Sequence, residues 1–160
     1  MFSIKSFCKI NANLRVLKKL KNNYHSIQSL IMFCDIFDLV SISQIKSSKD
    51  KIKFYGKFKK DIDNKSNTIS KLLNLLRKKG LIKKNFFLIK VKKNIPHGSG
   101  LGGGSSNAAT LLNFFKSKKI ISLSSEEMKS VGSKIGSDVP VLLNTKSALL
   151  TCKIGQIKIV

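Results

Sequence analysis

The stretch IPHGSGLGGGSSNAATLLNFF, residues 95–115, holds five of the ten glycines in the chain and runs directly into a helix-like pattern of apolar residues. Consecutive glycines permit positive φ angles and let backbone N–H groups approach a ligand closely. The start of the following helix adds partial positive charge, so the ligand that this combination favours is an oxyanion of phosphate. A tight turn with a capping serine is the alternative, but fewer glycines would suffice for it. We therefore expect a phosphate-binding loop.

Three common phosphate-binding motifs do not fit this loop. Residues 98–103 satisfy GxGxxG, but a half-polar strand and Pro96 precede them, and no acidic residue ends a second strand about 20 residues later, as a dinucleotide site requires. A Walker A loop needs Gly-Lys-Ser/Thr, whereas Gly104 is followed by Ser105. The HRD and DFG segments that accompany a protein kinase loop are missing from the sequence. Three roles stay open for Ser105 and Ser106: capping the helix, binding a phosphate oxygen, or helping to hold Mg²⁺.

Alternating apolar and polar residues predict strands before the loop. The first is residues 8–16, where Cys8, Ile10, Ala12, Leu14 and Val16 form the apolar face of a half-buried strand. Three more are expected at residues 24–43, 50–58 and 86–94, and in the last of these Ile89 and Val91 oppose Lys90 and Lys92.

Helices are predicted on both sides of the loop. One covers residues 66–80, with Ser66 or Asn67 as its cap, an apolar face of Ile69, Leu72, Leu73 and Leu76, and Gly80 at its end. The helix after the glycines buries Ala108, Leu111, Leu112 and Phe115, and Ser105 or Ser106 lies at its start. A third covers residues 123–136, with a capping box of Ser124 and Glu127 and a stop at Gly136.

The last part of the chain is predicted to return to strands. SDVPVLL, residues 137–143, leads into a short apolar strand, and residues 147–160 are interpreted as a strand pair. The order of strands, helix and strand along the chain predicts the α+β class.

The formal net charge of +23 raises the question of a nucleic-acid-binding surface. Arg15 and Arg77 are the only arginines, whereas proteins that read bases and phosphates rely on the bidentate arginine fork. The lysines are scattered from Lys5 to Lys158, as a compositional bias of an AT-rich genome would give. We therefore interpret the charge as a solvated surface, and a basic nucleic-acid-binding module remains a distant alternative.

Length and composition predict one domain with a real core, since the chain has 160 residues, of which 42% are hydrophobic. No apolar run approaches the roughly 18 residues of a membrane span. Cys8, Cys34 and Cys152 lie far apart without CxxC spacing, so neither a disulfide framework nor a zinc site is indicated. The N-terminus lacks the apolar core of a signal peptide, and a reducing compartment fits these features.

Four pieces of the sequence resemble the GHMP kinase family: CKINANL (8–14), YHSIQSL (24–30), IPHGSGLGGGSSNAAT (95–110) and IGSDVPVLL (135–143). The glycine motif is similar to that of the branch acting in the non-mevalonate pathway of isoprenoid synthesis. The order and spacing of the four pieces agree as well, so the resemblance spans essentially the whole chain. It implies a two-layer α+β fold like domain 2 of ribosomal protein S5. It also implies that residues 1–160 are the N-terminal, ATP-binding domain and that the family's C-terminal domain is absent.

The resemblance implies a reaction and its partners. The expected activity is ATP- and Mg²⁺-dependent phosphorylation of the 2-hydroxyl of 4-diphosphocytidyl-2-C-methylerythritol. The partner is then a small-molecule substrate, with no specific nucleic acid and no membrane. Because no N-terminal extension precedes CKINANL, we expect a bacterial cytoplasm rather than a plastid. Two alternatives stay open: a truncated, inactive fragment that still binds ATP, and a GHMP kinase for another small alcohol.

The family's functional positions fall on named residues of this chain. The resemblance makes Lys9 and Asp138 the catalytic pair. From its place in the loop, Ser105 is the candidate Mg²⁺ contact. The resemblance places Asn67 and Lys93 near the adenine of ATP. The residues expected to bind the rest of ATP are Pro96, Gly98, Ser99, Gly100, Leu101, Gly102, Gly103, Gly104, Ser105 and Ser106.

The implied catalytic pair is chemically reasonable. A carboxylate such as Asp138 can accept the proton of a substrate hydroxyl, while an ammonium such as Lys9 steadies the charge on the moving phosphoryl group. A plain ion pair with one of the many lysines is the alternative for Asp138.

The resemblance also predicts the substrate contacts. Asn11 lies beside the substrate, and Tyr24 and His25 stack on and hydrogen-bond its cytosine. A structural histidine is the alternative for His25, but the adjacent Tyr24 supplies the flat face that a base needs. We assign no role to His97.

Overall fold

A computed structural model describes residues 1–19, 25–60, 62–63, 66–144 and 148–151. The described strands form one sheet in the order β1-β2-β4-β3, with β5 paired to another part of β2. The β3–β4 pair is parallel and the other pairs are antiparallel. The strands are β1 (Phe2–Lys19), β2 (His25–Ile45), β3 (Lys51–Tyr55), β4 (Phe86–Lys92) and β5 (Ala148–Thr151).

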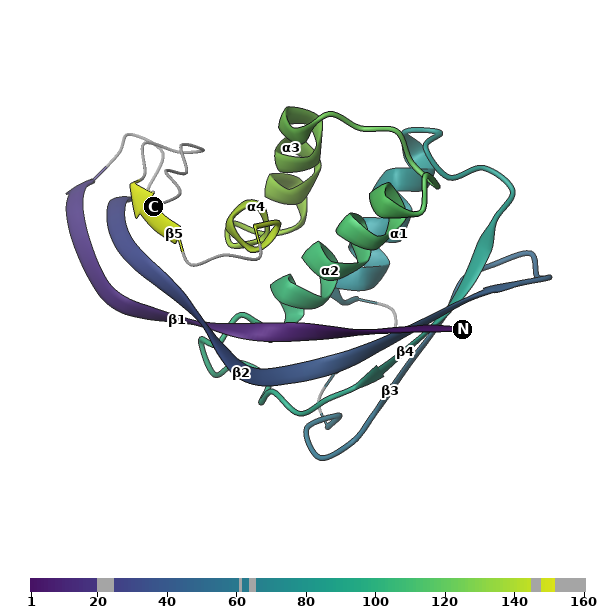
Figure 1. Cartoon of the computed structure of the whole chain (residues 1–160), viewed down its shortest axis with the longest axis horizontal. Helices are drawn as coiled ribbons and strands as arrows, with labels where there is room; N and C mark the ends of the chain where they lie inside the picture. The colour runs from purple at the N-terminus through teal and green to yellow at the C-terminus, as the bar shows by residue number, and fades with distance from the viewer. Residues whose placement is uncertain (20–24, 61, 64–65, 145–147, 152–160) are drawn as a thin grey trace.

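The helices lie together on one side of this sheet (Figure 1). They are α1 (Thr68–Lys78), α2 (Gly103–Ser117), α3 (Ser125–Ile135) and α4 (Val139–Leu142). The predicted two-layer α+β architecture is therefore confirmed. No helix in the described part of the chain is long and apolar enough to cross a membrane.

The core fills the space between the two layers. The apolar faces predicted for the two helices around the loop are buried: Leu72 and Leu76 on α1, Leu111 and Phe115 on α2. They pack in one cluster with buried residues of β2 and β4, namely Val40, Ile42, Ile89 and Val91. Burying a side chain of this size contributes roughly 1.5–3 kcal/mol, so this cluster is the main source of stability.

The helix starts differ in a way that matters for the site. Helix α1 has a capping box of Asn67 and Ser70, and α3 has the predicted box of Ser124 and Glu127. Helix α2 has no side-chain cap and begins after Gly102, whose φ of 70° is left-handed. The prediction that Ser105 or Ser106 caps α2 is wrong, because the glycines let the helix begin earlier and both serines lie inside its first turn.

Residues 139–142 form the short helix α4, so no strand begins within SDVPVLL, and residues 145–147, where the predicted strand would follow, lie outside the described residues. The Leu142 N–H donates to the Asp138 carbonyl at 3.1 Å, and the Leu143 N–H donates to the Val139 carbonyl at 3.1 Å. Pro140 lies in the first turn, where a missing N–H leaves no helical hydrogen bond unmade, whereas it would interrupt a central strand. Asp138 therefore sits at the junction of α3 and α4.

The strand predicted at residues 8–16 exists as part of β1, but its predicted apolar face is only partly correct. Cys8 is buried, whereas Ile10, Leu14 and Val16 are exposed and Lys9 is 6% exposed. The register with β2 shifts between Phe7 and Cys8 and again between Asn11 and Asn13, which breaks the simple alternation. The later part of β1 and the paired first part of β2 curve away to the left in Figure 1, where β5 joins β2.

The predicted strand pair at residues 147–160 is described only in part. Strand β5 pairs with residues 28–31 of β2. Residues 152–160 lie outside the described residues.

Candidate active site

A cavity of about 510 Å³ opens between the glycine loop, the start of α1 and the junction of α3 with α4. This volume is typical of a site for a small molecule. The cavity brings together most of the residues predicted from the sequence: Asn67, Lys93, Pro96, Gly98, Ser99, Gly100, Gly102, Gly103, Gly104, Ser105 and Asp138. Lys9, Asn11, Leu101 and Ser106 lie outside its lining.

The glycine loop has the backbone that the sequence predicted. Gly98, Gly100 and Gly102 have φ values of 71°, 75° and 70°. A Cβ on Gly102 would lie 3.0 Å from Lys9 Cγ, and a Cβ on Gly103 would lie 2.9 Å from Ile95 Cγ2. Bare backbone at these two positions lets the start of α2 pack closely on its neighbours. Because α2 has no side-chain cap, its first N–H groups remain available to an anion in the cavity.

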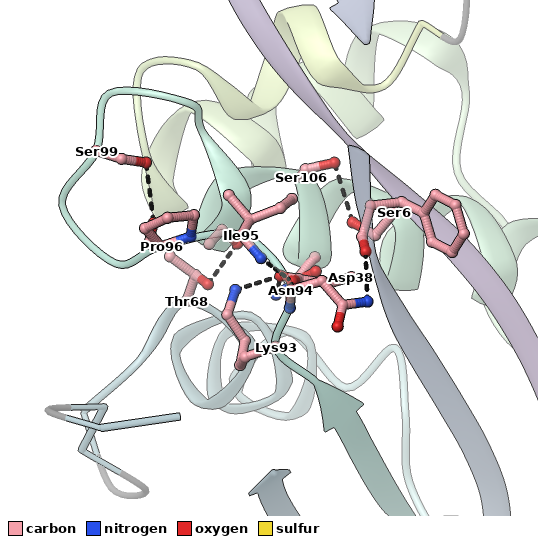
Figure 2. Close-up of polar contacts among 12 residues, drawn as sticks. Ser6, Asp38, Thr68, Lys93, Asn94, Ile95, Pro96, Ser99 and Ser106 are labelled. Carbon is pink, nitrogen blue, oxygen red and sulfur yellow. Dashed lines mark hydrogen bonds and ion pairs between the residues drawn. The ribbon is translucent and has the colours of Figure 1, made fainter. Parts of the chain in front are cut away.

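Hydrogen bonds fix the loop and α2 to β1 on both sides of Cys8. The Lys9 N–H donates to the Leu101 carbonyl at 2.9 Å. The Ser106 hydroxyl donates to the Phe7 carbonyl at 2.6 Å and accepts from the Ser6 hydroxyl at 3.0 Å (Figure 2). Ser106 is therefore occupied in holding β1, and the loop position is fixed relative to Lys9.

Two further hydrogen bonds fix the loop itself. The Thr68 hydroxyl at the start of α1 donates to the Gly104 carbonyl at 2.6 Å. The Ser99 hydroxyl donates to the Pro96 carbonyl at 2.9 Å within the loop (Figure 2).

Lys9 and Asp138, far apart in the sequence, meet beside the loop. The Lys9 Nζ lies 3.5 Å from Asp138 Oδ2 and donates to Asn11 Oδ1 at 3.2 Å. The Lys9 side chain is 8% exposed, whereas the Asp138 side chain is 42% exposed and lines the cavity. The ammonium is thus buried next to the carboxylate but outside the cavity lining, and the carboxylate has room to contact a ligand.

Burial raises the pKa of the Cys8 thiol, and Cys34, its partner across the β1–β2 pair, adds to the shift. Cys8 therefore packs beside Lys9 as a neutral thiol.

A buried acid that the sequence reasoning missed lies behind the loop. Asp38 on β2 is 0% exposed. Its carboxylate accepts hydrogen bonds from Lys93 Nζ, from the N–H groups of Asn94 at 2.8 Å and Ile95 at 2.9 Å, and from Asn107 Nδ2 at 3.0 Å (Figure 2). Lys93, predicted near the adenine, is therefore part of a buried ion pair in the cavity wall. The available signal was an acid within a β-prone run of a chain that holds only eight acids.

The predicted cytosine contacts cannot be placed in the same way. Tyr24 lies outside the described residues, and His25 is described only as the first residue of β2. His97, to which no role was assigned, is exposed at the edge of the cavity.

Within the described ranges, no group of three or more His, Cys, Asp or Glu residues could hold a metal ion. Ser105 lines the cavity at the start of α2, as its predicted role requires.

Comparison with known proteins gives sequence matches along the chain. Residues 67–145 match the family described as GHMP kinases N terminal domain. Two curated relatives are named 4-diphosphocytidyl-2-C-methyl-D-erythritol kinase. The one from Pelagibacter ubique is 46% identical over 157 residues, which cover 98% of this chain and 55% of that protein. The one from Clostridioides difficile is 33% identical over 147 residues, which cover 91% of this chain and 48% of that protein. The chain thus spans about half the length of these relatives.

Solved structures share the fold. A crystal structure of 4-(cytidine 5'-diphospho)-2C-methyl-D-erythritol kinase matches with a TM-score of 0.77 and 22% identity, covering 99% of this chain and 55% of that chain. A crystal structure of mevalonate kinase matches with a TM-score of 0.69 and 12% identity, covering 100% of this chain and 56% of that chain. At these identities the likeness shows the fold alone.

Proposed function

We propose that this chain is the N-terminal, ATP-binding part of a GHMP-family kinase for 4-diphosphocytidyl-2-C-methylerythritol, because residues 67–145 match the N-terminal domain of GHMP kinases and its relatives carry that name. The observation that carries the proposal is the Lys9–Asp138 pair next to an uncapped helix start and a glycine loop. The names of the relatives from Pelagibacter ubique and Clostridioides difficile support this substrate. The product would then enter isoprenoid precursor synthesis, and a bacterial cytoplasm is the proposed location.

The glycine loop is the proposed cradle for the phosphates of ATP. Except at Leu101, the loop from Gly98 to Ser105 lines the cavity, where N–H groups and the α2 dipole favour negative charge. Leu101 and Ser106 do not line the cavity. They hold the loop and α2 to β1 through hydrogen bonds. Asn67 and Lys93 line the same cavity, and the adenine is proposed to lie near them.

Mg²⁺ is proposed to arrive with ATP rather than to occupy a protein cage. No acidic cluster in the described part of the chain would hold it alone, which leaves the Ser105 hydroxyl as the proposed protein contact. When bound, the ion would neutralise negative charge on the phosphates.

In the proposed reaction, Asp138 accepts the proton of the substrate 2-hydroxyl, and the hydroxyl oxygen forms a bond to the γ-phosphorus of ATP. The bond from that phosphorus to the bridging oxygen breaks, and ADP leaves. Lys9, fixed by Asn11 and by the Leu101 carbonyl, supplies positive charge beside the moving phosphoryl group. Asn11 also places an amide beside the substrate. Tyr24 and His25 are the proposed cytosine contacts.

Release of ADP from ATP, Mg²⁺ and the cytidine substrate tests this proposal. Loss of a positioned base lowers turnover by about 10²–10⁴-fold, so Asp138→Asn and Lys9→Ala are each expected to fall in that range. Asp50→Asn serves as a control, because Asp50 pairs with Arg77 rather than with Lys9. Unchanged turnover in both site variants would contradict the assigned roles.

A second candidate function is ATP binding without turnover, and the observation that favours it is that the glycine loop lines the cavity whereas Lys9 and Asn11 lie outside its lining. Saturable ATP binding with no ADP release would support it. Turnover of a non-nucleotide alcohol, but not of the cytidine compound, would instead indicate a related kinase activity.

A further inference from the structure

The carboxylate of Asp38 connects the two elements that build the back wall of the cavity. Lys93, Asn94 and Ile95 lie directly after β4, on the segment that leads into the glycine loop, and Asn107 lies on α2. Four donors from these two elements converge on one side chain of β2 (Figure 2). A single acceptor group of Asp38 thus joins the two elements.

Stability alone is a poor explanation for this arrangement. A buried ion pair is expensive to desolvate, and well-packed apolar residues often stabilise a core as well or better. The Asp38 and Lys93 side chains are only 0% and 4% exposed. The ion pair does fix the position of the Lys93 ammonium. Lys93 Nζ lies 3.4 Å from the point that a Cβ on Gly103 would occupy. Asp38 thereby sets the location of Lys93 relative to the first residue of α2.

Asn107 shows the same effect on a neutral side chain. Its Nδ2 donates to Asp38 Oδ2 at 3.0 Å, which fixes the orientation of the amide. Its Oδ1 is buried without a hydrogen-bond partner among the described residues, although Asn107 lines the cavity. Buried acceptors are nearly always satisfied, so this oxygen is expected to receive a donor from a bound molecule or an ordered water.

We propose that Asp38 is a positioning residue of the nucleotide site, which holds Lys93, the entry to the glycine loop and the Asn107 amide in the arrangement that binds ATP. This inference rests on the proposed function. Asp38 does not touch the ligand and acts through the wall residues that it orients.

Asp50 provides a matched control on the other end of β4. It also pairs with a cation, Arg77 at 2.8 Å, and it accepts the Phe87 N–H at 2.8 Å. Unlike Asp38, its hydrogen bonds within the described part of the chain go to Arg77 and Phe87, not to the segment leading into the glycine loop or to α2. A purely structural acid and a positioning acid can therefore be compared at the two ends of one strand, β4.

The test measures ATP affinity of the 160-residue chain by calorimetry, together with the rise in melting temperature that ATP produces. Asp38→Asn keeps the size of the side chain but removes its charge, and we expect ATP to bind at least about tenfold more weakly, with the ATP-induced rise largely lost. Asp50→Asn is expected to melt at a lower temperature but to keep the wild-type affinity and the ATP-induced rise. Equal affinities in the two variants would overturn the proposal. Absence of ATP binding by the wild-type chain would instead contradict the proposed function.

If Asp38→Asn does not fold, Asp38→Glu tests whether Asp38 positions the nucleotide site. It keeps the negative charge opposite Lys93 but moves the carboxylate outward by one methylene group, so the wall residues shift while the ion pair survives. We expect a folded protein with several-fold weaker ATP binding, and Asp50→Glu with unchanged binding. Wild-type affinity in folded Asp38→Glu would overturn the proposal.

Discussion

The two ends of β4 are anchored by the same chemistry in different surroundings. At the first end, Asp50 forms a bidentate pair with Arg77, through Nε and Nη2 at 2.8 Å each, and these side chains are 12% and 22% exposed. At the second end, Asp38 pairs with Lys93, and exposure falls to 0% and 4%. Both acids also accept backbone N–H groups of the strand end or the residues just beyond it.

The difference shows how one strand can serve both stability and function. The Asp50–Arg77 pair keeps contact with solvent and mainly secures the start of β4 against α1. The Asp38–Lys93 pair is sealed from solvent and fixes the segment that leads into the glycine loop. Because the Asp38–Lys93 pair is buried, removing either partner is expected to lower the free energy of unfolding more than removing Asp50 or Arg77 would.

The largest expected contrast concerns stability after removal of each acid. Asp38→Ala leaves the Lys93 ammonium buried without a counter-charge, and we expect the free energy of unfolding to fall by about 3–5 kcal/mol. Asp50→Ala leaves a partly solvated guanidinium that still donates to the Asn85 carbonyl, so a loss of about 1–3 kcal/mol is expected. Urea denaturation of both variants measures the difference. Equal losses would mean that burial does not distinguish the two ends.

A second contrast uses glycines with the same backbone conformation near each end. Gly102 and Gly80 have φ values of 70° and 68°. A Cβ on Gly102 would press on Lys9 Cγ at 3.0 Å, whereas a Cβ on Gly80 meets nothing within 4 Å. Both Gly→Ala variants pay about 1–2 kcal/mol for the left-handed conformation. Only Gly102→Ala is expected to weaken ATP binding, by about tenfold to a hundredfold in a calorimetric titration.

The Gly102 prediction has a clear counter-result. If Gly80→Ala weakened ATP binding as much as Gly102→Ala, the effect would come from general destabilisation. The close contact between the loop and Lys9 would then have no special role.

The smallest effect is expected at Glu127, an exposed acid that contacts neither end of β4. Hydrogen bonds with Ser124 lower the pKa of Glu127 below its ordinary value of 4.5. The bond with the Ser124 backbone is the larger cause, and the bond with its side chain is the second. Because the folded pKa is depressed, the ionised carboxylate stabilises the fold above pH 4.5, and this contribution disappears as the pH falls through the lowered value. Glu127→Gln is expected to melt slightly below wild type at neutral pH and to converge with it in acid. A constant difference at all pH values would contradict this account.

The local elements were predictable because their signals are local. The apolar spacing of α1 and α2, the Ser124–Glu127 box and the alternation of β4 each lie within a few residues of one another. The glycine loop was predictable for the same reason, and the Lys9–Asp138 pair was expected only through the family resemblance. The phosphate-binding loop could therefore be proposed from the sequence alone.

What the sequence could not provide depends on contacts between distant segments. Asp38 is recognisable only when β2, the end of β4 and α2 meet around it. The burial of Lys9 beside Cys8 follows from register shifts in β1 that leave no pattern in the alternation. Helix α4 was missed because a short apolar run has no periodicity of its own, although Pro140 was a sign against a strand.

An NMR titration of the isotopically labelled chain with ATP and Mg²⁺ tests the central claim most directly, because it reports on both ends of β4 at once. We predict saturable shifts of the backbone amides from Gly98 to Ser105 and of Lys93 to Ile95, with small shifts around Asp50 and Arg77. Saturating ATP that leaves the loop amides unmoved, or shifts that gather around Asp50 and Arg77, would contradict the assignment of the glycine loop as the nucleotide site.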